Sequence, residues 1–347
     1  MKKIPSYISF LKENRTKSQA EEIYNQRIKD SEEVFNKFSN EFINRVCPVC
    51  GEQKYASLEK FNGQYSVVSC VKCSSTYVNP SPNLNALDYY YNNCKCNKQL
   101  GKLYKERVGK KGVILEERTM HVIQLVKSLL ETKSEIRILE VGCNSGAFLY
   151  ELKQAMLQEK CGSNVSLEGI DIDKFAVKNP VDDKITLYHS SAEEFVEKSE
   201  YKFDLILHFE LIEHLHNPYE FCCAIYRLLN NKGLMYFHTP NALGLDNTVL
   251  TYNDFRPLAH GIFPPMHLNA FTTQNVTHFL IRCGFNVNKI ETPGNFDVDI
   301  VRQFAPEDRN LAVINEVSNE KSLAIFQYVL RELGSSSHLA VLASKLD

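Results

Sequence analysis

The chain has 347 residues, of which 44% are hydrophobic and 24% charged, with a formal net charge of −2. This composition is typical of a globular protein with a sizeable core, and its charge disfavours a protein whose main partner is bulk nucleic acid. We find no apolar run of about eighteen residues and no signal-peptide pattern. Eleven cysteines without such a signal are typical of a reducing compartment, so we expect a cytoplasmic protein without a membrane span.

The changing sequence pattern divides the chain into five predicted segments. In chain order they are an amphipathic helical segment (1–45), a turn-rich four-cysteine module (46–82), a helical connector (83–132), an α/β domain (133–292) and a C-terminal extension (293–347). Within the fourth segment, short β-branched runs such as "IRILEVG" and "FDLILHF" alternate with amphipathic stretches. Strands that alternate with helices predict a mostly parallel sheet with helices on its faces.

The four cysteines of the second segment form two pairs. Cys47 and Cys50 lie in "CPVCG", and Cys70 and Cys73 lie in "CVKC". Each two-residue gap lets a tight turn direct both sulfur atoms at one ion, and four thiolates suit tetrahedral zinc. We therefore predict a structural zinc site; the alternative is a chance group of reduced thiols. The remaining cysteines are interpreted as small buried hydrophobic residues.

A glycine-containing loop follows the first strand of the α/β domain, in "IRILEVGCNSGAFLYELKQA". Gly142 and Gly146 let the backbone approach a ligand, and the N-terminus of the next helix offers free N–H groups. The second strand ends at Asp171 in "LEGIDID", where a carboxylate can bind the two hydroxyls of a ribose. The alternatives are a capping role for Asp171 or Asp173, and a dehydrogenase, which "GCNSG" disfavours because it lacks a third glycine.

A cluster of acids and histidines follows the strand "FDLILHF". Glu210, Glu213 and His214 have i, i+3, i+4 spacing, so a helical turn would place them on one face. With His267, or its neighbour His260, they predict a divalent metal site with open positions. Acid–base catalysis without metal and a purely structural role are the alternatives.

The order and spacing of these motifs resemble the class I S-adenosylmethionine-dependent methyltransferases over residues 110–290. The quoted motifs are "ILEVGCNSGAFL", "GIDID", "SSAEEF", "FDLILHFELIEHL" and "RLLNNKGLMYFHTPN". The fourth of these is most similar to the ubiquinone-pathway O-methyltransferases, and the cysteine segment resembles the zinc-binding leader of bacterial sugar and polysaccharide methyltransferases. The resemblance implies a seven-stranded Rossmann-like sheet. Asn144 departs from the usual middle glycine, but asparagine tolerates a left-handed backbone.

The resemblance also implies roles for individual residues. The cofactor's methionine end would lie near Glu140, Gly142, Cys143 and Gly146, and its ribose at Asp171. Its adenine would lie beside Ile172, Ser191 and Ala192, and its methyl group above His208. The E-x-x-E-H run with a later histidine resembles the metal site of small-RNA 3′-terminal 2′-O-methyltransferases. It implies Glu210, Glu213, His214 and His267 as ligands of Mg, Mn or another divalent ion.

These observations predict an S-adenosylmethionine-dependent O-methyltransferase that acts on a small molecule or a sugar or polysaccharide precursor. Glu213, His214 and His267 are the predicted catalytic residues. One alternative is an RNA ribose 2′-O-methyltransferase that docks its substrate with the zinc module. The other is a catalytically degenerate cofactor-binding protein.

Overall fold

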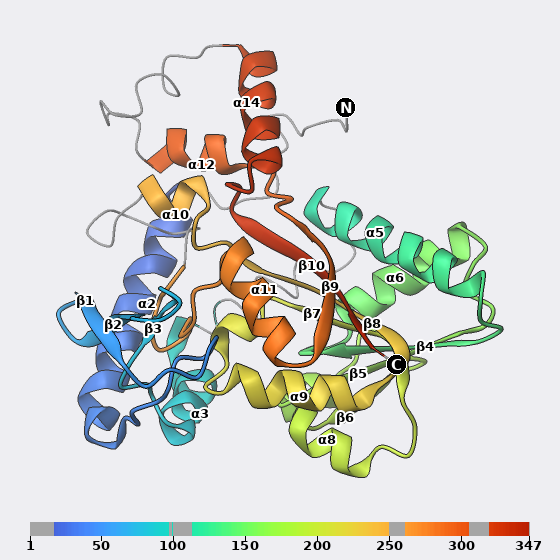
Figure 1. Ribbon diagram of the computed structural model, residues 1–347, viewed down its shortest axis with the longest axis horizontal. Coiled ribbons are helices and arrows are strands. Elements are labelled where there is room, and N and C mark those ends of the chain that lie inside the picture. The colour runs from blue at the N-terminus through green and yellow to red at the C-terminus, as the bar shows by residue number, and fades with distance from the viewer. Residues whose placement is uncertain (1–16, 97–98, 100–112, 250–260, 305–318, 347) are drawn as a thin grey trace.

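The fold is known from a computed structural model, which describes residues 17–96, 99, 113–249, 261–304 and 319–346 (Figure 1). Its centre is a seven-stranded sheet in the order β6-β5-β4-β7-β8-β10-β9. The strands are β4 (Ile136–Val141), β5 (Val165–Asp171), β6 (Thr186–His189), β7 (Phe203–Phe209), β8 (Leu229–Pro240), β9 (Phe285–Glu291) and β10 (His338–Lys345). The first five pair in parallel, whereas β10 runs antiparallel to both of its neighbours. The predicted mostly parallel, Rossmann-like sheet is confirmed.

Helices cover both faces of the sheet. One face packs against α5 (Val113–Leu130) and α6 (Ala147–Gln158), through residues such as Val122 and Leu152. The other packs against α8 (Ala192–Lys198), α9 (Pro218–Leu228) and α11 (Thr273–Arg282), through residues such as Phe221 and Phe279. The short helix α7 (Lys174–Lys178) follows β5. Because both faces are covered, the central strand β7 is buried along almost its whole length.

The N-terminal part lies beside this sheet, in blue and cyan in Figure 1. It contains α2 (Lys17–Phe38), the 3-10 turn Ser39–Glu41, a three-stranded sheet and α3 (Leu84–Asn93). The strands of the small sheet are β1 (Tyr55–Phe61), β2 (Tyr65–Cys70) and β3 (Thr76–Val78), paired antiparallel. Tyr77 and Val68 belong to the same hydrophobic cluster as Phe221 and Phe279. The hydrophobic core therefore crosses the predicted division between residues 46–82 and 133–292, and that division stays a prediction.

The C-terminal part both extends and completes the large sheet. Strand β10 inserts between β8 and β9, so the last strand in the chain is not at the sheet edge. The helices α10 (Leu245–Val249), α12 (Asp297–Phe304) and α14 (Glu320–Glu332) lie together at the top of Figure 1. Among the described residues, no helix is long and apolar enough to span a membrane.

Candidate functional site

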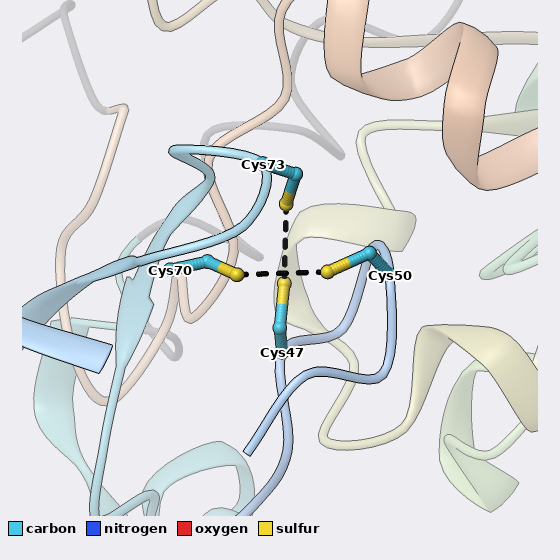
Figure 2. A group of neighbouring side chains, drawn as sticks. All are labelled: Cys47, Cys50, Cys70 and Cys73. Atoms are coloured by element: carbon cyan, nitrogen blue, oxygen red, sulfur yellow. Dashed lines mark hydrogen bonds between the residues drawn. The ribbon is translucent and has the colours of Figure 1, made fainter. Parts of the chain in front are cut away.

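The four predicted zinc ligands converge on one point (Figure 2). The Sγ atoms of Cys47 and Cys73 are 3.6 Å apart, and those of Cys50 and Cys70 are 3.5 Å apart. A zinc ion with Zn–S bonds of about 2.3 Å separates tetrahedral sulfur ligands by about 3.8 Å. The observed separations are close to that spacing, so the arrangement fits a tetrahedral ion.

Both cysteine pairs are shaped by the same kind of turn. The amide of Gly51 donates to the carbonyl of Cys47, and the amide of Ser74 donates to that of Cys70, each at 2.9 Å. Gly51 and Ser74 follow the second cysteine of their pairs and have φ angles of 77° and 57°. These left-handed residues close each turn, so that both sulfur atoms of a pair point to the same side.

The predicted glycine loop lies between β4 and α6. Gly142, Asn144 and Gly146 have φ angles of 75°, 49° and 77°, so the loop contains three left-handed residues. Asn144 stands where the similar methyltransferases usually have glycine, and it adopts the left-handed conformation that was predicted for it. Gly146 is the N-cap of α6 and provides no capping side chain. The Cys143 side chain is buried beneath the loop, where a Cβ on Gly169 would come within 2.6 Å of its sulfur.

Asp171, the predicted ribose-binding acid, ends β5 next to this loop. Its carboxylate accepts hydrogen bonds from the amides of Asn144 and Asp173, both at 2.7 Å. Burial raises the pKa of Asp171, although these amides act in the opposite direction. Asp173 is the residue that caps α7, by accepting from the amides of Phe175 and Ala176. The capping alternative therefore describes Asp173, while Asp171 is directed at the glycine loop.

The residues predicted to meet an adenine lie around the end of β5. The Ile172 side chain is 68% exposed, next to an equally exposed Phe175 that the sequence analysis did not identify. Ser191 caps α8 by accepting from the amide of Glu194, and Ala192 is buried in the first turn of that helix. Ile172 thus offers an apolar surface beside Asp171, whereas the side chains of Ser191 and Ala192 have structural tasks.

An acidic residue, Glu140, and a basic residue, Arg118, lie close to the glycine loop. The Glu140 side chain is buried, and its Oε2 atom has no hydrogen-bond partner among the described residues. Burial raises the pKa of Glu140 to about 8; the charge of Arg118 lowers it and that of Asp171 raises it further. Arg118, on α5, stacks over Phe209 at 4.2 Å and donates to Glu210 Oε1 at 3.2 Å. Glu140 could accept a hydrogen bond from an ammonium group, and Arg118 could bind a carboxylate. The two residues therefore suit a ligand that carries both groups.

His208 lies at the carboxyl end of β7, the strand end at which the resemblance placed it. Its side chain is completely buried, stacked on Phe237 at a centroid distance of 4.4 Å and in edge contact with Phe221. Burial lowers the pKa of His208 to about 3, against the opposing charge of Glu213, so the ring is neutral. Side chains alternate along a strand, and His208 shares the face of Ile206, which packs under α9. Both ring nitrogens are buried without a hydrogen-bond partner among the described residues, and contact of His208 with a cofactor stays a prediction.

Glu213, His214 and His267 meet at the carboxyl end of β7, in the 3-10 turn η2 (Ile212–His214) and the segment before α11. The Oε1 atom of Glu213 lies 3.5 Å from His214 Nε2 and 4.0 Å from His267 Nε2. The other carboxylate oxygen accepts from the Thr239 hydroxyl at 2.9 Å. Burial would raise the pKa of Glu213, but the charges of the two neighbouring histidines lower it below its usual value. The carboxylate is thus ionised, with one buried oxygen directed at two imidazoles.

Glu210 does not join this group. It has a φ angle of 52°, and this left-handed residue turns the chain away from the strand before the 3-10 turn begins. Its carboxylate lies instead beside Arg118 and within 3.7 Å of His338 Nε2. The predicted i, i+3, i+4 grouping requires one continuous helical turn, whereas the observed 3-10 turn covers only Ile212–His214. His260, the alternative to His267, lies outside the described residues.

The N-terminal part holds the two segments that carry the histidines. The Arg45 guanidinium donates to the carbonyls of His216 at 3.0 Å and Leu268 at 2.7 Å, and also to Val78. The two segments are also joined to each other, because the Asn269 side-chain amide donates to the carbonyl of Leu215 at 2.8 Å. Arg45 and Asn269 were not predicted from the sequence, and neither were Arg118 and Thr239. The only available signal was the position of Arg45 just before Cys47, which does not indicate a contact with either histidine segment.

Comparison with known families identifies the central part of the chain. A family model described as "Methyltransferase domain" matches residues 114–290, which is just over half of the chain. The chain belongs to this methyltransferase family. The matched range includes the glycine loop, Asp171, Glu213, His214 and His267, but not the four-cysteine cluster.

Similar proteins include ubiquinone biosynthesis O-methyltransferases. The one from Maricaulis maris is 30% identical over 112 residues, covering 30% of this methyltransferase chain and 41% of the relative. The one from Pelagibacter ubique is 28% identical over 116 residues, covering 33% and 47%. The chain thus spans less than half the length of the curated relatives it matches.

Solved structures with a similar chain course include the plantazolicin methyltransferase BpumL in complex with SAH. It is 16% identical, with a TM-score of 0.47, and the match covers 75% of this chain and 94% of that one. Another is a SAM-dependent methyltransferase from Archaeoglobus fulgidus, 19% identical with a TM-score of 0.42, covering 70% and 98%.

Proposed function

We propose that this protein transfers a methyl group from S-adenosylmethionine to a hydroxyl oxygen of a small molecule or of a sugar or polysaccharide precursor, with the help of a divalent metal ion. The observation that carries the proposal is the Glu213, His214 and His267 group at the carboxyl end of β7. Strand β7 pairs with β4, whose end bears the glycine loop, so an acceptor at this group would lie beside a cofactor in the loop.

The residues around the loop fit the charges of S-adenosylmethionine. The free buried oxygen of Glu140 supports a contact with its ammonium group, and Arg118 supports a contact with its carboxylate. Asp171 would accept hydrogen bonds from the ribose hydroxyls, and the exposed face of Ile172 would cover the adenine. When bound, the cofactor supplies an electrophilic methyl group on a sulfonium. The chain's own contribution is to hold that group in line with the acceptor oxygen.

The group formed by Glu213, His214 and His267 fits a divalent ion because one of its buried ligand atoms lacks a partner. Glu213 Oε1 is buried and has no hydrogen-bond partner among the described residues, although it lies between two imidazoles. Two histidines and one carboxylate are a ligand set that binds Mn, Fe, Co or Zn and leaves positions open. When bound, such an ion makes a nearby hydroxyl group more acidic. Thr239 holds the second carboxylate oxygen and thereby fixes the direction of the first.

We propose a separate, structural role for the four-cysteine cluster, with one zinc ion held by Cys47, Cys50, Cys70 and Cys73. Four thiolates fill a tetrahedral site, so no position is left for a substrate. The ion held by the cysteines would thus stabilise the four-cysteine module, whereas the ion held by Glu213, His214 and His267 would take part in catalysis.

Removal of the active-site ion tests the proposed function. Calorimetry should show that S-adenosylhomocysteine binds with the same affinity before and after treatment with a chelator. Methyl transfer to a panel of vicinal diols should stop after the treatment and return with Mg, Mn or Co. Zinc content is measured in parallel, to ensure that the cysteine site is still loaded. Full activity in the chelated, zinc-loaded protein would contradict metal assistance, and absence of cofactor binding would contradict the whole proposal.

A further inference from the structure

One tyrosine reaches from the N-terminal part of the chain to the metal-binding histidines. Tyr91, near the end of α3, places its hydroxyl oxygen 2.9 Å from Nδ1 of His214. The two neighbouring tyrosines on this helix face elsewhere. Tyr89 donates to Glu33 on α2, and Tyr90 is buried against α2 with Val34. The third of these consecutive tyrosines is therefore the one whose hydroxyl is seen against the group at the end of β7.

The position of α3 is set by local sequence and by packing. The Asn83 side chain caps the helix by accepting from the amide of Ala86 at 2.9 Å. Ala86 and Tyr90 then pack with Val34 of α2 and with Met266, which directly precedes His267. The helix is therefore anchored on both sides, and the Tyr91 hydroxyl is held against His214.

The Tyr91 contact involves one of the two ring nitrogens of His214, so it is linked to which nitrogen carries the proton. A neutral imidazole has one N–H donor and one acceptor nitrogen. His214 Nε2 lies 3.5 Å from the unpartnered Oε1 of Glu213, so this nitrogen is the one that would bind a cation and must keep its lone pair. The proton then belongs on Nδ1, and the Tyr91 oxygen is the atom in place to accept it.

We infer that Tyr91 is a positioning residue of the active site, which accepts the Nδ1–H of His214 and holds its Nε2 toward the metal ion. The inference rests on the metal centre proposed above. Ligand histidines generally need such a partner on the second nitrogen, and loss of the partner costs about 10- to 100-fold in metal affinity or activity. The N-terminal part of the chain would then supply part of the catalytic apparatus.

Manganese binding measures this role without reference to turnover. The full chain with its zinc site loaded is titrated with Mn²⁺, and free Mn²⁺ is read from its electron paramagnetic resonance signal. Tyr91→Phe should weaken Mn²⁺ binding about 10- to 100-fold and leave the affinity for S-adenosylhomocysteine unchanged. Tyr89→Phe is the matched control, because it removes one hydroxyl from the same helix without touching His214; it should bind Mn²⁺ like the unmodified protein.

The tautomer of His214 gives a readout that a purely structural role would not change. Long-range ¹H–¹⁵N spectra are recorded on histidine-labelled protein with a diamagnetic ion such as Mg²⁺ at a concentration that saturates the unmodified protein, and are assigned with His214→Ala. The unmodified protein should show the Nδ1–H form, and Tyr91→Phe, which binds the ion more weakly, should shift His214 toward the Nε2–H form. An Nε2–H form in the unmodified protein, or equal Mn²⁺ affinity in Tyr91→Phe, would overturn the inference alone. Failure of the unmodified protein to bind Mn²⁺ would overturn the metal centre and the inference together.

Discussion

The protein has two clusters of side chains that could hold a metal ion, and they are built in different ways. The cysteine cluster takes two ligands from each of two tight turns, and its four ligands leave no free position. The cluster at the end of β7 takes Glu213 and His214 from one turn and His267 from a distant segment, and it has three ligands. The first cluster is thus suited to stability and the second to chemistry.

The two regions are also connected. Arg45, two residues before Cys47, hydrogen-bonds the segments that carry His214 and His267, and Tyr91 contacts His214 itself. The backbone near the cysteine cluster can therefore help to fix the segments that carry His214 and His267. The following experiments test this difference and this connection.

The largest expected effect is on stability, from Cys47→Ser. Structural zinc sites contribute several kcal/mol or more to folding, so the variant should lose about one zinc ion per chain and melt at a markedly lower temperature. Methyl transfer should fall with it, because Arg45 lies beside Cys47. Metal analysis by mass spectrometry and thermal denaturation measure the change, with Cys161→Ser, outside the cluster, as the control. Zinc-free unmodified protein, purified without chelator, would remove the structural site.

Next in size are the substitutions of the open site. His214→Ala and Glu213→Ala should each lower the rate of methyl transfer by about 10²–10⁴-fold, the size typical of proton-transfer catalysis. The double variant should be little worse than either single one, because residues that act as a unit are not additive. Zinc content and cofactor affinity should stay unchanged. His278→Ala, an exposed histidine on α11, is the control. Additive losses would mean that the two side chains act independently.

A smaller effect is expected at the cofactor site. Asp171→Ala should weaken binding of S-adenosylmethionine by about 1.5–3 kcal/mol, or about 10- to 150-fold, the size of hydrogen bonds to a charged group. Asp173→Ala, which removes the cap of α7, should lower the melting temperature while leaving affinity nearly unchanged. Calorimetry measures both. Equal affinities in Asp171→Ala and the unmodified protein would show that the ribose is held elsewhere.

The smallest effect is a pH dependence of cofactor binding. Burial raises the pKa of Glu140 from 4.5 to about 8, so the folded protein keeps a proton that the unfolded chain has lost between these values. Glu140 therefore lowers stability as the pH rises from about 4.5 to 8. A cofactor ammonium favours the ionised carboxylate, so binding should release a proton and become several-fold tighter between pH 6 and 7.

Glu140→Gln isolates this effect from the titration of the cofactor's own amino group. The variant should bind more weakly and lose the proton release that calorimetry in buffers of different ionisation enthalpy detects. Proton release of the same size in Glu140→Gln and the unmodified protein would show that Glu140 does not face the ammonium group.

The sequence by itself determined the features that depend on short spacings. The two-residue gaps of the cysteine pairs and the left-handed positions of the glycine loop need only a local turn, and both have the predicted form. The parallel sheet follows from the alternation of strands and helices. The tertiary structure decided which side chains are buried and which distant residues meet, because both depend on how helices, strands and loops pack together.

Three residues illustrate that dependence. His208 lies on the strand face that packs under α9, so it is buried, and Glu210 is turned away by a left-handed backbone that no local pattern indicated. Tyr91 meets His214 only because α3 packs against α2 and beside the loop that carries His267. Local spacing fixes a turn, whereas contacts between distant segments follow from the packing of the whole chain.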